Sequence, residues 1–440
     1  MLTDSADCND QQQNYPGLSR LKSSEIPHNL SVSLLTGGSD RPYVYGLATS
    51  LISQGVSLDM IGSDELDFPE FQREPRIRLL NLRGSTDSNA NPIAKIARVL
   101  RYYAKLIGYA ATAKPGIFHI LWNNKFETFD RIFLMLYYRL LQKKIVLTVH
   151  NVNAGRRDSR DSRLNRLTLR IQYRLSKHIF VHTEKMKSEL IEQFGGRGAS
   201  ITVIPFGINN TVPNTSLTPT DAKRRLGFGE HEKAILFFGN IRPYKGLEYL
   251  IAAFRQVLAM GQSCRLIIVG RPSKCEEYWT TIRNEIREDV QSGQVLLKAE
   301  FIPDDEAEVY FKAADVLVLP YREIYQSGVL FTGYSFGLPV IAAEVGSLKD
   351  EIVEGSTGFV FRPEDPVDLA KAIQRYFASD LYADLRNRRG EISAYAMERH
   401  SWDVVGQMTK SVYASLLRMP LSGTSLNPGV PSASHDAEVS

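Results

Sequence analysis

A chain of 440 residues exceeds the size of one ordinary hydrophobic core and favours two domains with tails. Its composition, 43% hydrophobic and 23% charged, excludes a largely disordered protein. With 53 Lys and Arg residues against 49 Asp and Glu residues, the net charge of +4 does not indicate nucleic-acid binding, and three scattered cysteines give no disulfide framework.

The two ends of the chain differ from the rest in composition. Residues 1–28 begin with an acidic, polar stretch that lacks a secretory-signal pattern, and residues 420–440 are rich in Ser and Pro. Both are expected to be disordered tails. No apolar run reaches the roughly 18 residues that span a bilayer. We therefore expect a cytoplasmic protein, either free or attached peripherally to the inner face of the cytoplasmic membrane.

Between the tails, short apolar runs alternate with helical patterns. Most runs are apolar throughout rather than alternating, as in strands that are buried on both faces of a sheet. The alternation predicts an α/β fold of two Rossmann-like, doubly wound domains that face each other across a cleft. The predicted strands are SVSLLT, SLDMIG, IRLLNL, IFHILW, KIVLTVH, HIFVHT and ITVIPFG, followed by AILFFGN, RLIIVG, VLLKAEF, DVLVLP, PVIAAEV and GFVFRP.

A polar stretch rich in Pro, Thr and Asn, residues 209–221, interrupts the series and predicts a linker. It separates an N-terminal domain, residues 29–208, from a C-terminal domain, residues 222–400, and a terminal helix that crosses back to the first domain is expected over residues 401–419. Ligands of open parallel sheets bind beyond the carboxyl ends of strands, so we expect the site in the cleft. Neither a dinucleotide fingerprint nor a P-loop motif occurs.

The first segment that carries chemistry follows the strand that ends at Gly239. Its loop bears Arg242 and Lys245 immediately before a predicted helix. Two cations beside a helix N-terminus make a favourable site for a diphosphate, because the first N–H groups of a helix have no partner within it. The alternative is that Arg242 and Lys245 are ordinary solvated loop charges.

The second segment, residues 315–365, predicts a strand, a loop, and a helix opened by Gln326, Ser327 and Gly328. Together the two segments carry G-x-x-R-P-x-K-G-L, A-D-V-x-V-L-P, S-G-V-L, G-x-P-V-I-A and E-I-V-E-G-S-T-G-F in that order. With these motifs the chain resembles the large family 4 ("group 1") glycosyltransferases of the GT-B fold, most clearly over residues 234–378.

The resemblance implies a retaining hexosyltransferase that moves a sugar from a nucleotide-diphosphate sugar to a glycan or lipid-linked acceptor, as in cell-surface polysaccharide or glycoconjugate biosynthesis. Arg242 and Lys245 would stabilise the leaving diphosphate, which would itself take the acceptor proton. No metal, other cofactor or nucleic-acid partner is expected, because the cations and a helix terminus balance the diphosphate charge. The implied donor contacts are Gly239, Glu300, Phe301, Ile302, Glu323, Gln326, Ser327, Gly328 and Val329.

One departure from the family pattern concerns the donor. Many members carry two glutamates separated by seven residues, at the places where this chain has Ile324 and Thr332. Glu323 is one residue from the first place. Thr332 offers a hydroxyl group to a ribose, which is a weaker contact than a carboxylate. The departure bears on the identity of the donor more than on the reaction.

The N-terminal half contributes further candidates. Gly37 and Gly38 match the family's Gly-rich turn after the first strand, where they would approach the donor phosphates or the acceptor; a plain strand-to-helix turn explains them equally well. Arg41 and Tyr43 follow at a helix start and are candidates for acceptor contact. His150 ends an apolar strand and matches the family's T-x-H, which implies that it orients the donor sugar.

Two helical patterns, residues 93–107 and 163–177, combine cations with apolar residues at helical spacing and contain no acid. A basic amphipathic helix fits an anionic membrane surface or a phosphorylated acceptor. The alternative is that the apolar residues pack on the sheet and the cations are solvated. We favour this alternative, because every helix of a doubly wound fold needs an apolar face for the sheet.

Two other functions share this architecture. A sugar-nucleotide epimerase would need acid and base residues around the sugar that the sequence does not offer. A catalytically decayed, transferase-like binding subunit would explain the missing glutamates. The presence of Arg242, Lys245 and His150 argues against decay.

Overall fold

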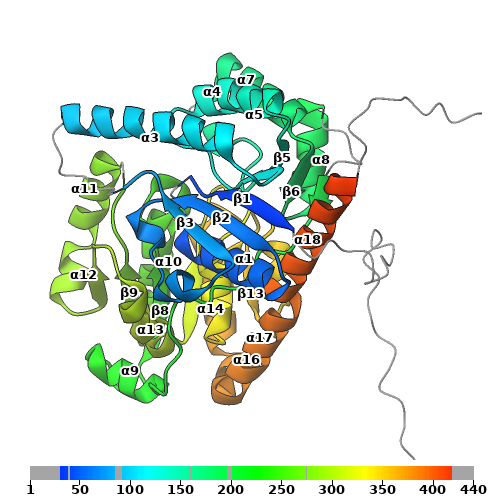
Figure 1. Cartoon of the computed structure of the whole chain (residues 1–440). Helices are drawn as coiled ribbons and strands as arrows, with labels where there is room; N and C mark the ends of the chain where they lie inside the picture. Colours follow the sequence, from blue (N-terminus) through cyan, green and yellow to red (C-terminus); the bar gives the residue numbers. More distant parts are fainter. Residues whose placement is uncertain are drawn as a thin grey trace, which may run out of the picture.

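The computed structural model shows two α/β halves that lie against each other (Figure 1). The expected tails, residues 1–28 and 420–440, lie outside the part of the chain that the structure describes. That part comprises residues 30–37, 40–84, 92–157, 161–195, 201–273 and 275–418.

Seven parallel strands form the N-terminal sheet in the order β3-β2-β1-β4-β5-β6-β7. Val, Ile, Leu and Phe dominate the central strands, which are buried on both faces as a parallel sheet requires. The strands are β1 (Ser31–Leu35), β2 (Ser57–Gly62), β3 (Ile77–Asn81), β4 (Ile117–Ile120), β5 (Lys144–Thr148), β6 (His178–Val181) and β7 (Ile201–Val203).

This sheet separates two apolar layers. Ile117 of β4 belongs to a cluster that includes the inner face of the first helix, whereas its neighbour Phe118 belongs to a second cluster with helices from the rest of this half. The helical elements are α1 (Arg41–Ser53), η2 (Asp64–Leu66), α2 (Pro69–Arg73), α3 (Pro92–Thr112), α4 (Glu127–Phe129), the short π-helix η3 (Asp130–Leu134), α5 (Met135–Leu140), α6 (Ala154–Arg157), α7 (Arg163–Leu175) and α8 (Glu184–Phe194). Helices α3, α5, α7 and α8 all contribute to the second cluster, so they cover the same face of the sheet.

Six parallel strands form the C-terminal sheet in the order β10-β9-β8-β11-β12-β13. They are β8 (Lys233–Phe238), β9 (Cys264–Val269), β10 (Val295–Lys298), β11 (Val316–Leu319), β12 (Val340–Ala343) and β13 (Gly358–Phe361). The predicted strands therefore all form, and the predicted fold of two doubly wound parallel sheets is confirmed.

The helical elements of the C-terminal half alternate with its strands. They are α9 (Pro219–Arg225), η5 (Pro243–Lys245), α10 (Leu247–Ala259), α11 (Glu276–Glu285), α12 (Arg287–Gln291), α13 (Asp304–Ala313), α14 (Gly328–Ser335), η6 (Lys349–Glu351), α15 (Pro366–Phe377), α16 (Asp380–Ala383) and α17 (Leu385–Arg399). No helix in the described ranges is long and apolar enough to cross a bilayer.

The last helix, α18 (Trp402–Arg418), leaves the C-terminal half and lies along the N-terminal half (Figure 1). It packs on α1, where Ser50 Oγ donates a 2.6 Å hydrogen bond to the Trp402 carbonyl. The Trp402 indole N–H donates to the Ile208 carbonyl at 2.7 Å, and Tyr413 contacts His119 of β4. The two halves are thus joined twice, by the chain around Ile208 and by α18.

Each sheet reverses its strand order at one place, and this determines where a ligand can bind. In the N-terminal sheet the reversal lies between β1 and β4, and in the C-terminal sheet between β8 and β11. Connections leave such a pair of strands in opposite directions, which opens a crevice beyond their carboxyl ends.

Candidate functional site

A cavity of about 350 Å³ lies between the two halves, beside the reversal point of the C-terminal sheet. The start of α1, the segment that follows β7, the loops after β8 and β11, the first turns of α14 and the start of α18 all contribute to it. Its lining residues are Asp40, Pro42, Tyr43, Phe206, Gly207, Asn209, Phe238, Tyr244, Lys245, Tyr321, Ile324, Gln326, Ser327, Gly328, Val329, Thr332 and Trp402.

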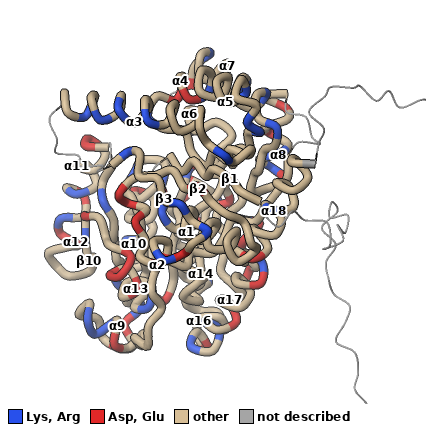
Figure 2. Tube along the Cα trace, in the orientation of Figure 1, with Lys and Arg blue, Asp and Glu red and all other residues tan. Residues whose placement is uncertain are grey.

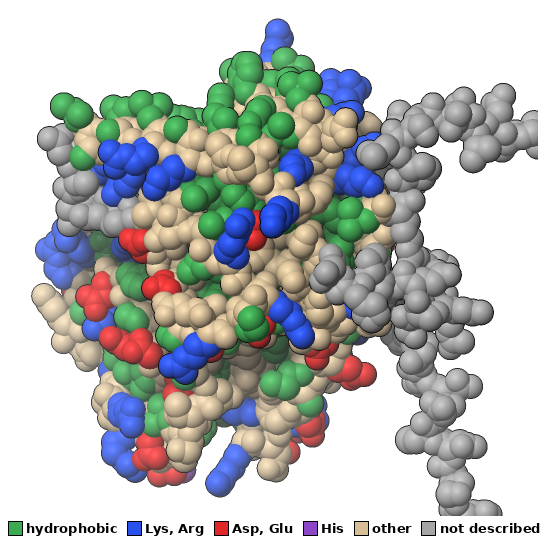
Figure 3. All heavy atoms as spheres, viewed as in Figure 1, with side chains coloured by type: hydrophobic (Ala, Val, Ile, Leu, Met, Phe, Trp, Pro, Cys, Tyr) green, Lys and Arg blue, Asp and Glu red, His purple; other side chains and the backbone are tan. Residues whose placement is uncertain are grey.

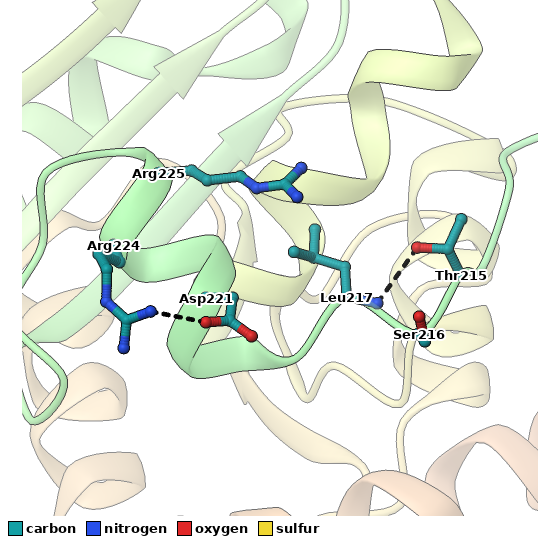
Figure 4. Close-up of a pocket in the computed structure, with 6 residues that line it drawn as sticks. All are labelled: Thr215, Ser216, Leu217, Asp221, Arg224 and Arg225. Carbon is teal, nitrogen blue, oxygen red and sulfur yellow. Dashed lines mark hydrogen bonds and ion pairs between the residues drawn. The ribbon is translucent and has the colours of Figure 1, made fainter.

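A second, more open cavity of about 450 Å³ lies at the start of α9 (Figure 4). Two of its charged side chains, Arg224 and Asp221, form an ion pair with each other at 2.8 Å. None of its lining residues follows the carboxyl end of a strand in the C-terminal sheet. We therefore assign the functional site to the cavity between the halves, where strand ends converge.

Lys245 is the cation that the structure brings into the site. It ends the short turn η5, its side chain is buried at 6% exposure, and its ammonium lies 5.3 Å from the centre of the Tyr321 ring. A Cβ atom on Gly239 would lie 2.9 Å from the Lys245 Nζ, so glycine is what lets the ammonium sit over the end of β8. Arg242 instead lies half-buried outside the lining, 5.7 Å from the Tyr244 ring.

The N-terminus of α14 faces the same cavity. Gly328 and Val329 are its first residues, and the preceding Ser327 forms no side-chain cap. The first N–H groups of a helix have no partner within the helix and carry positive dipole charge. Lys245, in the loop after β8, and the start of α14, which follows the loop after β11, therefore both present positive charge to the same cavity.

Gln326 and Thr332 also line the cavity, but their polar side-chain atoms differ in whether they can bind a ligand. Gln326 donates through Nε2 to Glu351 at 3.4 Å, and its buried Oε1 has no hydrogen-bond partner in the described part of the chain. Thr332 donates to the Gly328 carbonyl and accepts from Asn209, both at 3.0 Å. The Thr332 hydroxyl thus binds within the protein, which reduces what it offers to a ribose.

Several predicted donor contacts lie outside the cavity lining, among them Gly239, which nevertheless lies beside the Lys245 ammonium. Glu300 is exposed and pairs with Lys298 at 2.7 Å, Phe301 is 64% exposed, and Ile302 is buried. Glu323 lies 3.9 Å from the Arg156 guanidinium of the N-terminal half. Glu300, Phe301, Ile302 and Glu323 therefore do not line the cavity that holds Lys245.

His150 follows β5 and lies in an aromatic cluster. Its ring stacks on Trp122 with centroids 4.2 Å apart, and Tyr43 meets it edge-on at 4.7 Å. Burial, with a contribution from the neighbouring His182 and His119, holds the pKa of His150 well below its ordinary range. The ring is therefore neutral at pH 7, and its partners Tyr43 and Phe206 line the cavity.

The hydrogen bonds of the two histidines assign their protons. His182 Nδ1 lies 3.3 Å from the Ile204 carbonyl, which can only accept, so Nδ1 carries the proton. His182 Nε2 is then the acceptor for His150 Nδ1 at 3.1 Å. The buried Nε2 of His150 has no partner in the described residues and is left as an acceptor.

The Gly-rich turn after β1 and the start of α1 make most of their contacts with other parts of the protein. Gly37 has φ +62°, and a Cβ there would lie 2.6 Å from the Trp122 carbonyl oxygen, so glycine allows the loops after β1 and β4 to touch. Gly38 lies outside the described residues. Arg41 pairs with Asp304 of the other half at 3.7 Å, and Tyr43 is buried at 1% exposure.

Sequence reasoning missed several residues of the site. Trp122 follows the end of β4 as His150 follows the end of β5. The position that made His150 a candidate could therefore have identified Trp122 as well. Asn209 fell in the predicted linker, and Tyr321 and Phe206 offered no motif. Trp402 reaches the cavity only because α18 returns to the N-terminal half.

Comparisons with known proteins agree with this geometry. Residues 37–211 match the family described as Glycosyltransferase Family 4, and residues 232–379 match that described as Glycosyl transferases group 1. The D-inositol 3-phosphate glycosyltransferase of Acidothermus cellulolyticus is 29% identical over 52% of this chain and 51% of its own length. That of Corynebacterium efficiens is 24% identical over 84% and 89%. The chain spans between half and two thirds of the first curated relatives it matches.

Two solved structures share the fold at low identity. Sucrose-phosphate synthase from Thermosynechococcus elongatus superposes with a TM-score of 0.70 at 18% identity, covering 88% of this chain and 99% of that one. Anabaena Alr3699/HepE in complex with UDP-glucose gives a TM-score of 0.67 at 16% identity, with coverage of 88% and 99%.

Proposed function

The chain belongs to the family 4 (group 1) glycosyltransferases of the GT-B fold, and from this we propose that it moves a hexose from a nucleotide-diphosphate sugar to a glycan or lipid-linked acceptor with retention of configuration. One observation carries the proposal: the buried Lys245 and the start of α14 face a single cavity between the halves. Positive groups in this arrangement complement a diphosphate. The Anabaena protein that shares the fold binds UDP-glucose, which supports a donor of this class.

In the proposed reaction, Lys245 stabilises the negative charge that develops on the leaving diphosphate. A cation held at 6% exposure acts in a medium of low dielectric, where its interaction with an anion is stronger than in water. Arg242 approaches the diphosphate from the cavity rim, and the N–H groups of Gly328 and Val329 bind it from α14. With these charges the transfer needs no metal ion. The departing diphosphate takes the proton of the acceptor hydroxyl.

His150 orients the donor sugar in this proposal. Its ring is neutral and its Nε2 is an acceptor, so it can receive a hydrogen bond from a sugar hydroxyl but cannot donate one. The stacked Trp122 fixes the plane of the ring. We further propose that the acceptor belongs to cell-surface polysaccharide or glycoconjugate assembly at the inner face of the membrane.

The test is nucleotide binding by the wild type and by Lys245→Met, measured as thermal stabilisation by UDP, GDP and ADP. A nucleotide at 100 times its Kd adds about 2.7 kcal/mol of stability. Loss of a hydrogen bond to a charged group costs about 1.5–3 kcal/mol, so Lys245→Met should weaken binding about 10- to 100-fold.

Lys371→Met is the matched control, because Lys371 is exposed on α15, away from the cavity. It should bind nucleotide as the wild type does. Equal binding by Lys245→Met would overturn the assigned diphosphate site. Binding without any sugar transfer, or sugar isomerisation in place of transfer, would overturn the proposed reaction.

A further inference from the structure

Most of the exposed large hydrophobic side chains in the described part of the chain lie within residues 93–167. Figure 3 shows hydrophobic side chains gathered along the upper edge of the molecule, over α3 and over the α4, α5 and α7 group. We call this surface the upper face. Its exposed members are Ile93, Ile96, Leu100, Ile107, Phe126, Phe133, Leu136, Leu140, Leu164 and Leu167.

Helix α7 buries Leu169 and Tyr173 against the protein, but it leaves two other leucines at the surface. Leu164 and Leu167 are 59% and 52% exposed, whereas Thr168 and Gln172 are buried against the protein. The buried polar groups are satisfied: Gln172 Nε2 donates to Asn123 at 2.7 Å, and Thr168 accepts from Arg131 at 3.2 Å. The expectation that Leu164 and Leu167 pack on the sheet is therefore wrong, and these side chains are left for a contact outside the chain.

Two helices of the upper face, α3 and α7, are also basic. Neither α3 nor α7 contains an Asp or Glu, and in Figure 2 the charged residues along α3 are all Lys or Arg. The cations of the two helices are Lys95, Arg98, Arg101, Lys105, Arg163, Arg166, Arg170 and Arg174. Apolar side chains flanked by cations are the chemistry of surfaces that bind anionic lipid interfaces.

The elements of the upper face form one continuous surface. Tyr103 of α3 stacks on Phe126 at 5.7 Å, and the Tyr137 hydroxyl donates to the Ile107 carbonyl at 3.2 Å. Helix α7 packs on η3 and α5. All of them cover the same face of the N-terminal sheet, so their exposed apolar side chains can enter one interface together.

We propose that the upper face docks on an anionic phospholipid bilayer. The Lys and Arg side chains are attracted to the anionic headgroups, and the apolar side chains insert below them. A second copy of the chain fits less well, because α3 and α7 contain no Asp or Glu and the exposed Glu127 of α4 is already paired with Arg131, so two upper faces would bring like charges together. The bilayer supplies the opposite charge and the apolar layer at once.

The upper face is connected to the functional site by one loop. Tyr102 of α3 donates to Asn124 at 2.6 Å, and Gln172 of α7 binds Asn123, so both basic helices hold the loop after β4. That loop also contains Trp122, which stacks on His150. A lipid-linked acceptor in the bilayer would thus lie near the donor sugar; this step rests on the proposed function, whereas bilayer docking does not.

The test is co-sedimentation of the whole chain with vesicles of phosphatidylglycerol and phosphatidylcholine at low salt. The wild type should pellet with these vesicles, should be released as salt is raised, and should not pellet with phosphatidylcholine alone. The variant Ile96→Ser, Leu100→Ser, Leu164→Ser, Leu167→Ser should bind at least about tenfold more weakly, because it removes apolar area that enters the bilayer.

A variant with three exposed apolar residues of the C-terminal half replaced, Met260→Ser, Val367→Ser and Met397→Ser, is the control and should bind vesicles as the wild type does. Nucleotide-induced stabilisation of each variant shows that it is folded and separates this test from that of the donor site. Absence of wild-type binding, or equal binding by the fourfold variant, would overturn the proposal. So would a wild-type dimer that the fourfold variant converts to monomer without any change in vesicle binding.

Discussion

At the scale of single residues, Gly246 connects the Lys245 turn to the start of α10. Its φ is +64°, and a Cβ atom there would lie 2.0 Å from the Pro320 carbonyl oxygen at the end of β11. Alanine would add left-handed strain and also push the two site loops apart. We predict that Gly246→Ala lowers the free energy of unfolding by at least about 3 kcal/mol, measured by chemical denaturation, and weakens nucleotide binding.

Gly261 provides a matched comparison. Its φ is also positive, at +83°, but nothing lies within 4 Å of the place its Cβ would take. Gly261→Ala should therefore cost only the backbone strain, about 1 kcal/mol, and should leave nucleotide binding unchanged. Similar losses in the two variants would show that the contact with Pro320 is not what makes Gly246 necessary.

Individual residues also show which features of the candidate site could be predicted from the sequence and which could not. Lys245 and the Gln326–Val329 turn follow neighbouring strands, and strand ends of a parallel sheet meet, so their convergence could be predicted. The proton assignment of His150 could not, because it depends on His182 and the Ile204 carbonyl, which are brought together by folding. The bond between Asn209 and Thr332 joins a connecting segment to a helix and left no sequence pattern.

At the scale of elements, two glycines inside helices differ in what surrounds them. A Cβ on Gly406 of α18 would lie 2.0 Å from Ser50 Oγ and 3.2 Å from the Ser50 backbone carbon in α1, whereas one on Gly390 of α17 would meet nothing within 4 Å. We predict that Gly406→Ala destabilises the protein by about 1–3 kcal/mol, because α18 must move off α1.

Gly390→Ala should instead stabilise it by about 0.5–1 kcal/mol, because alanine restricts the unfolded chain and favours the helix. Urea denaturation of the two variants beside the wild type measures both effects. If Gly406→Ala were as stable as Gly390→Ala, the packing of α18 on α1 would be looser than the structure has it.

Helix α7 shows what the periodicity of apolar residues in the sequence cannot predict. The pattern over residues 163–177 correctly predicts a helix, but it assigns the leucines to the core. The buried side of α7 instead holds Leu169 and Tyr173 together with two polar residues, Gln172 and Thr168, whose partners are Asn123 and Arg131. A sequence pattern identifies which residues of a helix share one face. It does not identify the residues that pack against this face, because they come from other parts of the chain.

At the scale of the whole molecule, apolar and neutral contacts do more than charges to hold the halves together. The ion pairs between them, Arg41 with Asp304 and Arg156 with Glu323, are 3.7 and 3.9 Å long and largely exposed, so each contributes little. The contact through Trp402 is buried and well packed.

Buried histidines make the stability of this assembly depend on pH. His119 lies between β4 and α18, bound to Thr148 at 2.7 Å and to Tyr413, and burial lowers its pKa to about 3. Burial likewise lowers the pKa of His182 to about 4. The ordinary pKa of about 6.5 applies in the unfolded chain. As pH falls from 7 to 5, the unfolded chain gains protons that the folded chain does not, so stability falls by about 2 kcal/mol per histidine.

Chemical denaturation at pH 7 and pH 5 checks this with two variants. His119→Gln should reduce the loss between the two pH values by about 2 kcal/mol, because the titrating group is gone. His231→Gln, at an exposed position, should leave the loss unchanged. Burial raises the pKa of Asp130 to about 6, which opposes the loss, but this contribution is common to all three proteins and cancels in the comparison. An unaltered pH dependence in His119→Gln would mean that His119 accepts a proton in the folded protein, and that the contact between β4 and α18 tolerates the charge.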